Sequence, residues 1–414
     1  MYGESQDKVK DEAMSLSNNK VCLIILVALS GIMLFIIAAA AVSVVKFDYP
    51  FHINLASGIT LSDLSHPFAF IKKNCYPVWH VLTRLTMGVF GSTGRTAAIF
   101  VTAGCVVSTW FFAVLYLGKR HAEVEFSFLL AASVILMIVT PIYLSFFNDR
   151  LIWGQWGPNM YHNPTHLMVR AVAVPCFLLY MTDLERIDRG FCGQFGLRRL
   201  LALSLVFLLA TFSKPSFIQT FIPSISLIFI YEARKHGRPM LKPLALLGLT
   251  LLPAVAVCCL QFCTSFYGSQ ADAGGVEFSF LKAWSCYSPC VPVSCLLATL
   301  FPLVMAAWAV RARRFTIHDA MAWLMLFIGL IEGAVLSEKG PRAIHGNFLW
   351  GWALGLFFVW LTAMEKFVSL VRVNAGGFVH GGGWWGRAAV VTLSAHFLSG
   401  IWYLWRLIVF RNCM

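Results

Sequence analysis

The chain has 414 residues, of which 59% are hydrophobic and only 12% are charged. Soluble globular proteins carry about a quarter charged residues, so this composition excludes an ordinary soluble enzyme. The 32 Lys and Arg residues exceed the 19 Asp and Glu residues, but they form short clusters between apolar runs rather than a basic stripe with interleaved aromatics. A nucleic-acid partner is therefore excluded as well.

The apolar runs predict an all-α, polytopic membrane helical bundle, because about 20 apolar residues cross a bilayer as a helix. The run 21–45 is too long for the core of a cleaved signal peptide and follows a charged leader at 1–20, so we interpret it as a retained signal anchor. Residues 21–414 then form a single transmembrane domain with about eleven spans. The predicted spans are 21–45, 96–118, 124–147, 164–182, 200–213, 216–232, 243–263, 281–309, 318–336, 347–364 and 388–405.

Two connections stand out along the chain. The longest, 46–95, contains the half-apolar stretches 68–71 and 78–85, which predict helices lying along the membrane interface. The shortest is Lys214-Pro215, which joins two short spans. Those two spans form either an intramembrane hairpin or two full crossings.

The basic residues predict the orientation of the chain. A cytosolic N-terminus assigns 19 of the 32 Lys and Arg residues to inner segments, and every inner connection holds at least two, as the positive-inside rule expects. We interpret these clusters as orientation anchors without chemistry. The histidines beside them, such as His121 and His318, are predicted to be solvated.

The remaining polar residues gather on the opposite, outer face. Six of the 11 histidines lie there, together with a few carboxylates and cations. This one-sided distribution of polar residues favours a site at the outer interface, because a transporter more often places its charges near the midplane of the membrane. The cysteines lie mostly inside apolar runs and no zinc-ligand set accompanies them, so no metal site is predicted, although a divalent metal cofactor stays open.

The segment 154–166 is the most informative. Asn163 suits an N-cap and Pro164 a first helical position, so a span begins here with its N-terminus on the outer side. His166 and Arg170 are four residues apart and project from one helix face, where Arg170 and free backbone N–H groups make an anion site, with a phosphate as the obvious ligand.

Other residues of this segment are candidates for substrate binding. His162 and His166 fit a substrate site, or a metal if a third ligand exists. Tyr161, with Trp153 and Trp156, suits stacking on a sugar. The alternative for these aromatics is an interfacial belt.

Two outer cationic positions suit a phosphate. Lys214, between two apolar runs, needs an anionic partner unless it snorkels to the headgroups. In the segment 337–347, Lys339 and Arg342 can clamp a phosphate. The neighbouring polar residues Glu338 and His345 are also candidates for substrate binding. The alternative for Glu338 is a simple ion pair with Arg342.

Three outer carboxylates are candidates for a general base. Asp48 lies just past the outer end of the first apolar run, close to the bilayer and within reach of water. Its rivals are Asp63 and Asp149, which also suit a helix cap or a solvated loop charge. The alternative for Asp48 is pairing with Lys46.

With these residues in place, the chain resembles the integral-membrane glycosyltransferases of the GT-C class. The resemblance rests on an anchor span, a long outer loop with the early acid Asp48, and interfacial helices around Tyr76-Pro77-Val78-Trp79-His80, with His80 a candidate for substrate binding. It implies transfer of a sugar from a polyprenyl-phosphate donor to a glycan or lipid-linked acceptor at the outer face, with inversion. It also implies Asp48 as base, and Lys214, Lys339 or Arg342 as phosphate ligands. Many members have a second acid where this chain has Tyr49.

Two other classes stay open. An O-antigen-type polymerase or ligase also uses a polyprenyl-linked substrate, but its Arg and His residues are expected in a large late loop, whereas the longest loop here is the first. A lipid or sugar transporter is the non-enzymatic alternative, and internal repeats, of which none is evident, would favour it.

Overall fold

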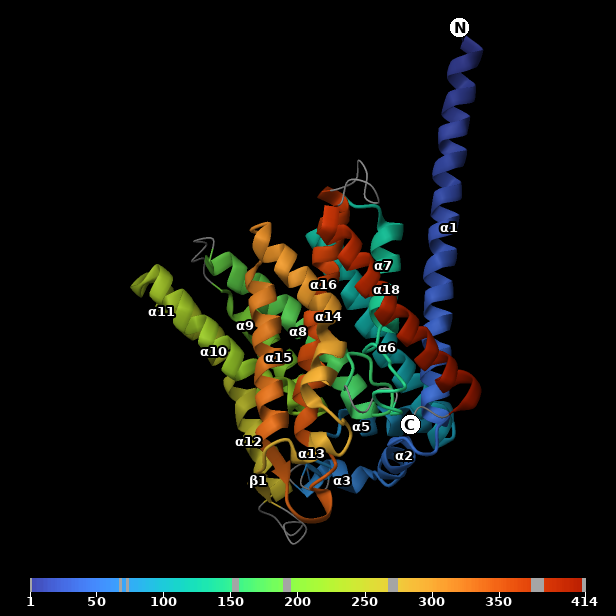
Figure 1. Ribbon diagram of the computed structural model, residues 1–414. Helices are drawn as coiled ribbons and strands as arrows, with labels where there is room; N and C mark the ends of the chain where they lie inside the picture. The colour runs from blue at the N-terminus through green and yellow to red at the C-terminus, as the bar shows by residue number, and fades with distance from the viewer. Residues whose placement is uncertain are drawn as a thin grey trace.

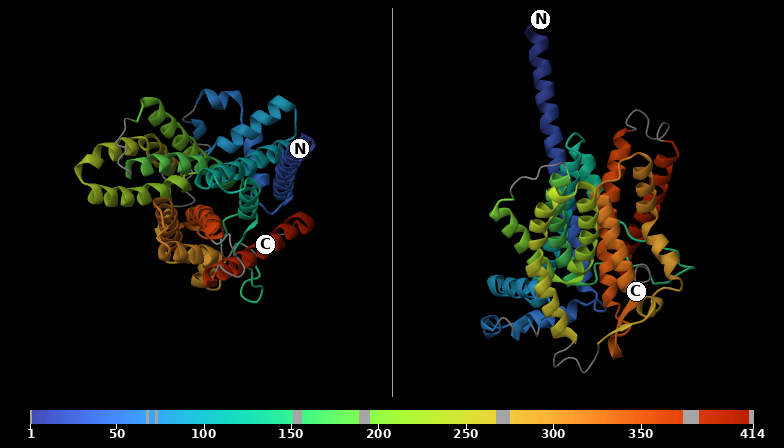
Figure 2. Two further views of the ribbon diagram at one scale, coloured as in Figure 1. Left: turned by 90° about the horizontal axis from the view of Figure 1, so that it is seen from above. Right: turned by 90° about the vertical axis from the view of Figure 1, so that its left-hand side faces the viewer.

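The computed structural model describes residues 2–66, 69–71, 74–150, 156–188, 195–266, 275–373 and 383–411. It is almost entirely helical, with one small two-stranded sheet (Figures 1 and 2). The principal elements are α1 Tyr2–Ser43, α2 Tyr49–Ser57, α3 Leu61–Ser65, α5 Val78–Phe90, α6 Gly94–Arg120, α7 Phe126–Ile138, α8 Pro164–Asp188, α9 Leu197–Ser213, α10 Ser216–His236, α11 Leu241–Leu249, α12 Leu252–Phe266, β1 Val276–Phe278, α13 Lys282–Ser285, α14 Val291–Arg311, α15 Ile317–Val335, β2 Leu336–Glu338, α16 Trp350–Val373 and α18 Gly383–Trp405. Short 3₁₀ turns η1, η3 and η4 lie at Arg238–Met240, Gly340–Arg342 and Asn347–Leu349, and the chain continues past α18 as a π-helical turn, Arg406–Phe410.

The expected all-α, polytopic architecture is confirmed, but the count of eleven spans is too high. Within the described residues, eight helices are long and apolar enough to cross a membrane, and a bent pair, Arg238–Leu249 with Leu252–Thr264, raises the number to nine at most. The chain is thus a multi-pass membrane protein with fewer crossings than its apolar runs suggest.

Two predicted spans fail for a local reason. The run 124–147 is helical only over α7, 13 residues or about 20 Å long, and ends before Thr140-Pro141 because a residue that precedes proline is disfavoured in the α conformation. The run 200–213 is part of α9, whose 17 residues end at Ser213; Lys214, the next residue, is extended because it precedes Pro215. In addition, the run 281–309 begins as the short helix α13, and its long helix starts only at Val291.

The helices differ in how deeply they are buried. In the most apolar stretch of α16, 94% of the residues are buried, which places this helix at the centre of the bundle. In the corresponding stretch of α1 only 17% are buried, because α1 lies at the edge of the bundle, against α6. Helix α16 packs closely on α15 because glycines line their contact. A Cβ on Gly329 would lie 2.4 Å from the Gly351 carbonyl carbon, and one on Gly355 would lie 2.7 Å from the Leu326 backbone.

The two ends of the bundle differ in charge and in architecture. Basic residues occupy the last turns of α6, α8, α10, α14 and α16, where cations complement the helix dipoles. These helices all end on the side of the bundle from which α1 extends to the N-terminus of the chain, hereafter the end near the N-terminus (Figure 1). The first long loop lies across the opposite end as α2, α3 and α5 (Figures 1 and 2). The small sheet also lies there, with Val276 opposite Glu338, and it was not predicted from the sequence.

Candidate functional site

Asn163 lies at the centre of the candidate site, at the start of α8. As predicted, it caps this helix: its Oδ1 accepts a hydrogen bond of 2.8 Å from the backbone N–H of His166, and Pro164 is the first helical residue. The other atom of the same amide, Nδ2, donates to Oδ2 of Asp48 over 2.7 Å. Lys214 Nζ donates to Oδ1 of Asn163 over 3.3 Å. One side chain therefore links the candidate base to the candidate phosphate ligand.

Lys214 is a buried cation at the break between α9 and α10. Its side chain is 7% exposed, and no ion pair joins it to a carboxylate in the described part of the chain. The ammonium lies over the ring of Trp350, 3.9 Å from its centroid, and 6.0 Å from that of Tyr76. Burial lowers the pKa of Lys214 to about 7, against the opposing effect of the Asp48 carboxylate. An anion entering here would supply the missing counter-charge.

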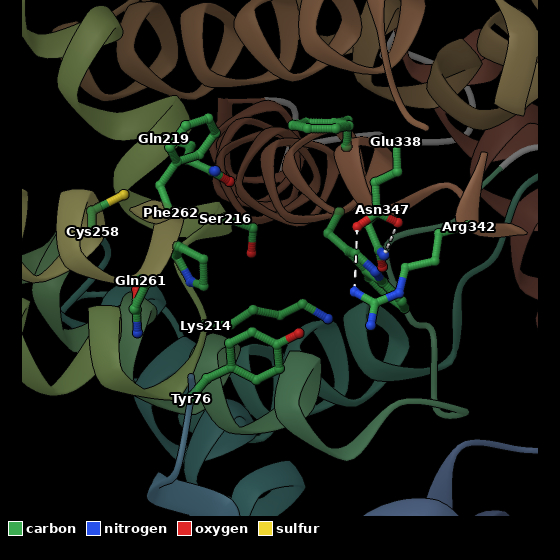
Figure 3. Close-up of a pocket in the computed structure, with 13 residues that line it drawn as sticks. Tyr76, Lys214, Ser216, Gln219, Cys258, Gln261, Phe262, Glu338, Arg342 and Asn347 are labelled. Atoms are coloured by element: carbon green, nitrogen blue, oxygen red, sulfur yellow. Dashed lines mark hydrogen bonds and ion pairs between the residues drawn. The ribbon is translucent and has the colours of Figure 1, made fainter. Parts of the chain in front are cut away.

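A cavity of about 120 Å³ opens beside Lys214 (Figure 3). It is built from five separate parts of the chain, namely the first loop, the α9–α10 break, α12, the turn after β2 and the start of α16. Its lining residues are Tyr76, Lys214, Pro215, Ser216, Gln219, Cys258, Gln261, Phe262, Glu338, Arg342, Asn347, Phe348 and Trp350.

Arg342 and Glu338 form the wall opposite Lys214 (Figure 3). Their ion pair is long, 4.0 Å between Arg342 Nη1 and Glu338 Oε1, and the Arg342 side chain is 45% exposed. Glu338 Oε2 is held by Asn347 Nδ2 at 2.7 Å. The expected ion pair is therefore present, and it leaves most of the guanidinium available to a ligand. The cavity thus has one cation on each side.

His162 and His166 lie behind this cavity rather than in it. Both rings pack on Trp350, with centroids 5.3 and 4.8 Å away, and both residues are buried. Burial lowers the pKa of His162 to about 4, so its ring is neutral at physiological pH. They support the wall that carries Lys214 and are not cationic phosphate ligands in this structure.

Arg170 and Tyr161 hold the irregular segment before α8. Arg170 is fully buried and shares a helix face with His166 as predicted, but its Nη1 donates to the carbonyl of Pro158 and to Asn159 Oδ1, at 3.0 and 2.9 Å. The Tyr161 hydroxyl donates to the carbonyl of Met137 over 2.6 Å. Neither residue lines the cavity, so Arg170 does not contribute to it, and the anion site on Arg170 stays a prediction. Trp153, the other predicted sugar-stacking residue, lies outside the described residues.

His80 belongs to a histidine pair in the first loop. Its Nε2 lies 2.8 Å from Nδ1 of His52, and α5 thereby meets α2. Burial lowers the pKa of His52 to about 3 and that of His80 to about 4, so the two rings share a hydrogen bond as neutral groups. This pair fixes the loop that carries Asp48 and Tyr76.

Four other predicted residues lie away from the cavity. Asp63 completes a capping box with Thr60 at the start of α3, the structural alternative named for it. Asp149 is exposed at a separate surface recess, and Lys339 and His345 are exposed on the loop after β2. Of the three candidate carboxylates, Asp48 is hydrogen-bonded to Asn163, which also contacts Lys214.

Several lining residues were not predicted, above all Gln219, Gln261 and Trp350. Gln261 Nε2 donates to the carbonyls of Cys75 and Thr211, at 2.6 and 3.0 Å, and so ties α12 to the first loop and to α9. A lone amide within an apolar run was the available signal, since a buried amide needs partners. Nothing in the sequence tells which partners these are.

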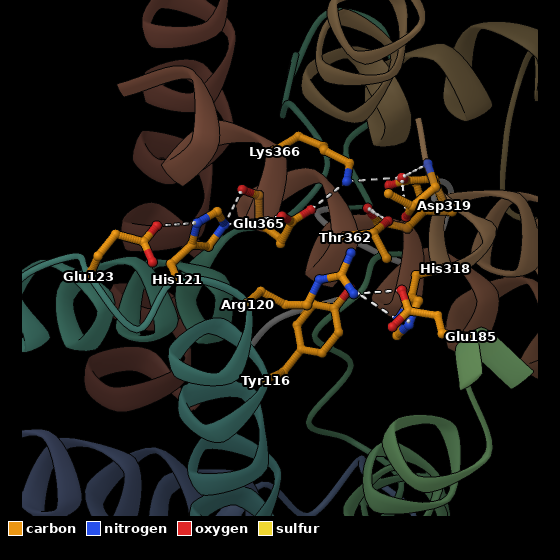
Figure 4. Close-up of polar contacts among 12 residues, drawn as sticks. Tyr116, Arg120, His121, Glu123, Glu185, His318, Asp319, Thr362, Glu365 and Lys366 are labelled. Carbon is orange, nitrogen blue, oxygen red and sulfur yellow. Dashed lines mark hydrogen bonds and ion pairs between the residues drawn. The ribbon is translucent and has the colours of Figure 1, made fainter. Parts of the chain in front are cut away.

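A second polar cluster lies at the end near the N-terminus (Figure 4). Glu185 pairs with Arg120 at 2.6 Å and with His318 at 3.2 Å, while Glu365 pairs with His121 at 3.0 Å. Both histidines are 3% exposed, so the prediction that they are solvated is wrong. They are buried because carboxylates from neighbouring helices reach them. Lys366 extends the cluster to Asp319.

No family model matches the chain, and no curated protein matches its sequence. The geometry of the site is therefore the basis of the functional argument.

Proposed function

We propose that the chain is a membrane glycosyltransferase that moves a sugar from a polyprenyl-phosphate donor to an acceptor hydroxyl. The observation that carries the proposal is the arrangement of Asp48, Asn163 and Lys214 beside a cavity whose opposite wall holds Arg342. Two cations suit a lipid phosphate, and a partly exposed carboxylate one amide away suits a base. The resemblance to the GT-C class gives the same roles to Asp48, Lys214 and Arg342.

In the proposed reaction, Asp48 takes the proton of the acceptor hydroxyl as its oxygen attacks the anomeric carbon. The bond between that carbon and the phosphate oxygen breaks, and the lipid phosphate leaves with the electron pair. Lys214 and Arg342 stabilise the charge that develops on this phosphate, and they are already in place before the reaction begins. Asn163 holds Asp48 through Nδ2 and leaves the other carboxylate oxygen for the acceptor.

The proposed orientation puts the N-terminus in the cytosol and this site on the outer face. Two features support it. The helix ends near the N-terminus are basic, as the positive-inside rule expects of a cytosolic face, and the site lies at the opposite end beneath the loop helices α2, α3 and α5.

The test is donor turnover by the purified full-length chain in lipid nanodiscs. Radiolabelled polyprenyl-monophosphate hexoses are supplied with glycan and lipid-linked acceptors, and sugar transfer is counted. Asp48→Asn should lower the rate by about 10²- to 10⁴-fold, the usual contribution of a general base. Asp149→Asn removes an exposed carboxylate outside the site and should leave the rate unchanged.

Two results would contradict the proposal. Full activity of the Asp48→Asn variant would move the base elsewhere. If no donor of the panel is consumed, while the donor lipid is carried intact between leaflets, the chain is a transporter rather than a transferase.

A further inference from the structure

A second cavity lies at the bundle end near the N-terminus, opposite the proposed transfer site. Its volume is about 600 Å³, and it is bounded by the ends of α8, α10 and α15. Its lining residues are Arg120, Glu185, Asp188, Leu227, Ile228, Tyr231, Glu232, Lys235, Phe315, Thr316, Ile317, Ala320 and Leu324. Neither the predicted site nor the proposed mechanism uses any of these residues.

The lining of this cavity combines apolar and charged residues. On α10, Leu227 and Tyr231 are 48% and 61% exposed, and they belong to the apolar outer flank of a helix long enough to cross a membrane. The last turns of the same helix add Glu232 and Lys235, and α6 and α8 add the other charged residues. A cavity that is continuous with the lipid-facing surface and also carries charges fits an amphiphile, because its chain and its headgroup meet matching surroundings.

The charged residues of the lining select the headgroup. Glu185 and Asp188 are paired, with Arg120 at 2.6 Å and Lys235 at 2.7 Å respectively. Glu232 differs: its side chain is 3% exposed, and in the described part of the chain no Lys or Arg forms an ion pair with it; its Oε2 lies 3.3 Å from His236 Nε2. A buried carboxylate with no permanent cation beside it is costly, so an ammonium group in the cavity would be stabilising there.

Donors for a phosphate are also present. The Lys235 side chain is 43% exposed, and Glu232 and Lys235 are three residues apart on α10, with Cβ atoms about 5–6 Å apart. A phosphate and an amine joined by two carbons can reach both. We propose that the cavity binds a zwitterionic phospholipid whose headgroup carries a primary amine, as phosphatidylethanolamine does. Its amine contacts Glu232, its phosphate contacts Lys235, and its chains lie along α10.

Other ligands fit less well. An anionic lipid would meet three carboxylates, and a quaternary amine has no N–H to donate to Glu232. The ligand atoms of Asp188, Glu232 and His236 lie within 4.8 Å of one another, which suits a divalent cation. However, Lys235 Nζ lies 2.7 Å from Asp188 Oδ1, and its positive charge would repel such an ion.

The test is native mass spectrometry of the full-length chain, delipidated in detergent and mixed with equal amounts of dioleoyl phosphatidylethanolamine, phosphatidylcholine and phosphatidylglycerol. The ethanolamine lipid should be retained at least fivefold over the other two. Glu232→Gln should lower its retention about tenfold, whereas Glu125→Gln, an exposed carboxylate at the same end, should not change it. Ala320→Phe, which fills the cavity without removing a charge, should also release the lipid.

Equal retention of the three lipids would overturn the proposal, as would retention that neither Glu232→Gln nor Ala320→Phe lowers. Stoichiometric binding of Mn²⁺ or Zn²⁺ to the lipid-free chain, lost in the Glu232→Gln variant, would assign the cluster to a metal and would overturn it too. If Glu232→Gln does not fold, the comparison of lipids and the Ala320→Phe variant decide. None of these measurements depends on sugar transfer.

Discussion

Replacing Lys214 by methionine should stabilise the chain and at the same time weaken its binding of an anionic lipid. The pKa of Lys214 is lowered from 10.5 to about 7, mainly by burial. A change of that size corresponds to roughly 5 kcal/mol of unfavourable free energy for the charged form. The Trp350 ring, 3.9 Å from the ammonium, offsets up to about 2 kcal/mol. Methionine has a similar length and no charge, so a net gain of about 3 kcal/mol is expected below pH 7.

The stability gained by Lys214→Met should depend on pH. Between pH 7 and 10.5 the unfolded chain holds a proton on Lys214 that the folded chain has lost, so the stability of the parent protein rises with pH in this window. The advantage of Lys214→Met therefore shrinks by about 1.4 kcal/mol per pH unit above pH 7 and vanishes near pH 9.

The binding of a lipid phosphate by the parent protein should weaken as pH rises, whereas its stability increases. Only the protonated Lys214 attracts a phosphate, so the affinity for a polyprenyl monophosphate should fall by up to tenfold per pH unit above pH 7. Lys214→Arg is the matched control, because guanidinium stays charged and its pH profile should be flat over this range. Thermal unfolding in detergent at pH 6 and pH 9, with lipid-phosphate binding at the same two values, measures both effects. Equal stability of the methionine variant and the parent at pH 6, with unchanged binding, would refute the reasoning.

Three further predictions concern the scaffold of the site. Asn163→Ala should cost about 1 kcal/mol through loss of the α8 cap, and it should lower transfer as well because Asp48 loses its partner; unfolding and activity measure these separately. Gly329→Ala should destabilise the chain by about 1–3 kcal/mol because the new Cβ meets the α16 backbone. Gly104 has open space around it, so Gly104→Ala should be neutral or stabilising by up to about 1 kcal/mol. Equal melting temperatures of the two variants would contradict this prediction. His52 and His80 have lowered pKa values, so the unfolded loop takes up protons first as pH falls below 6.5, and proteolysis within 46–95 should increase between pH 7 and pH 4, less so in His52→Phe.

Local features of the sequence determined much of the architecture. Hydropathy alone identified a multi-pass, all-α membrane protein, and the N-cap Asn163 and the break at Lys214-Pro215 followed from side-chain chemistry and from the conformation that proline imposes. Hydropathy also caused the overcount of membrane spans, because an apolar run scores as a span whether or not its residues are helical. Pro141 ended α7 after 13 residues, and the apolar residues that follow form irregular structure and a turn.

The candidate site was predicted as a set of polar residues on one face, but only the tertiary structure decided which of them meet. Asp48, Asn163 and Lys214 are separated by 115 and 51 positions, and no local pattern reports such a contact. The same reason explains why Arg170 donates to the segment before α8 rather than lining the cavity, and why the prediction for His121 and His318 was wrong, since neighbouring helices cover both. The sequence shows that a polar group lies in an apolar run and therefore needs a partner, but the packing of the helices decides which residue that partner is.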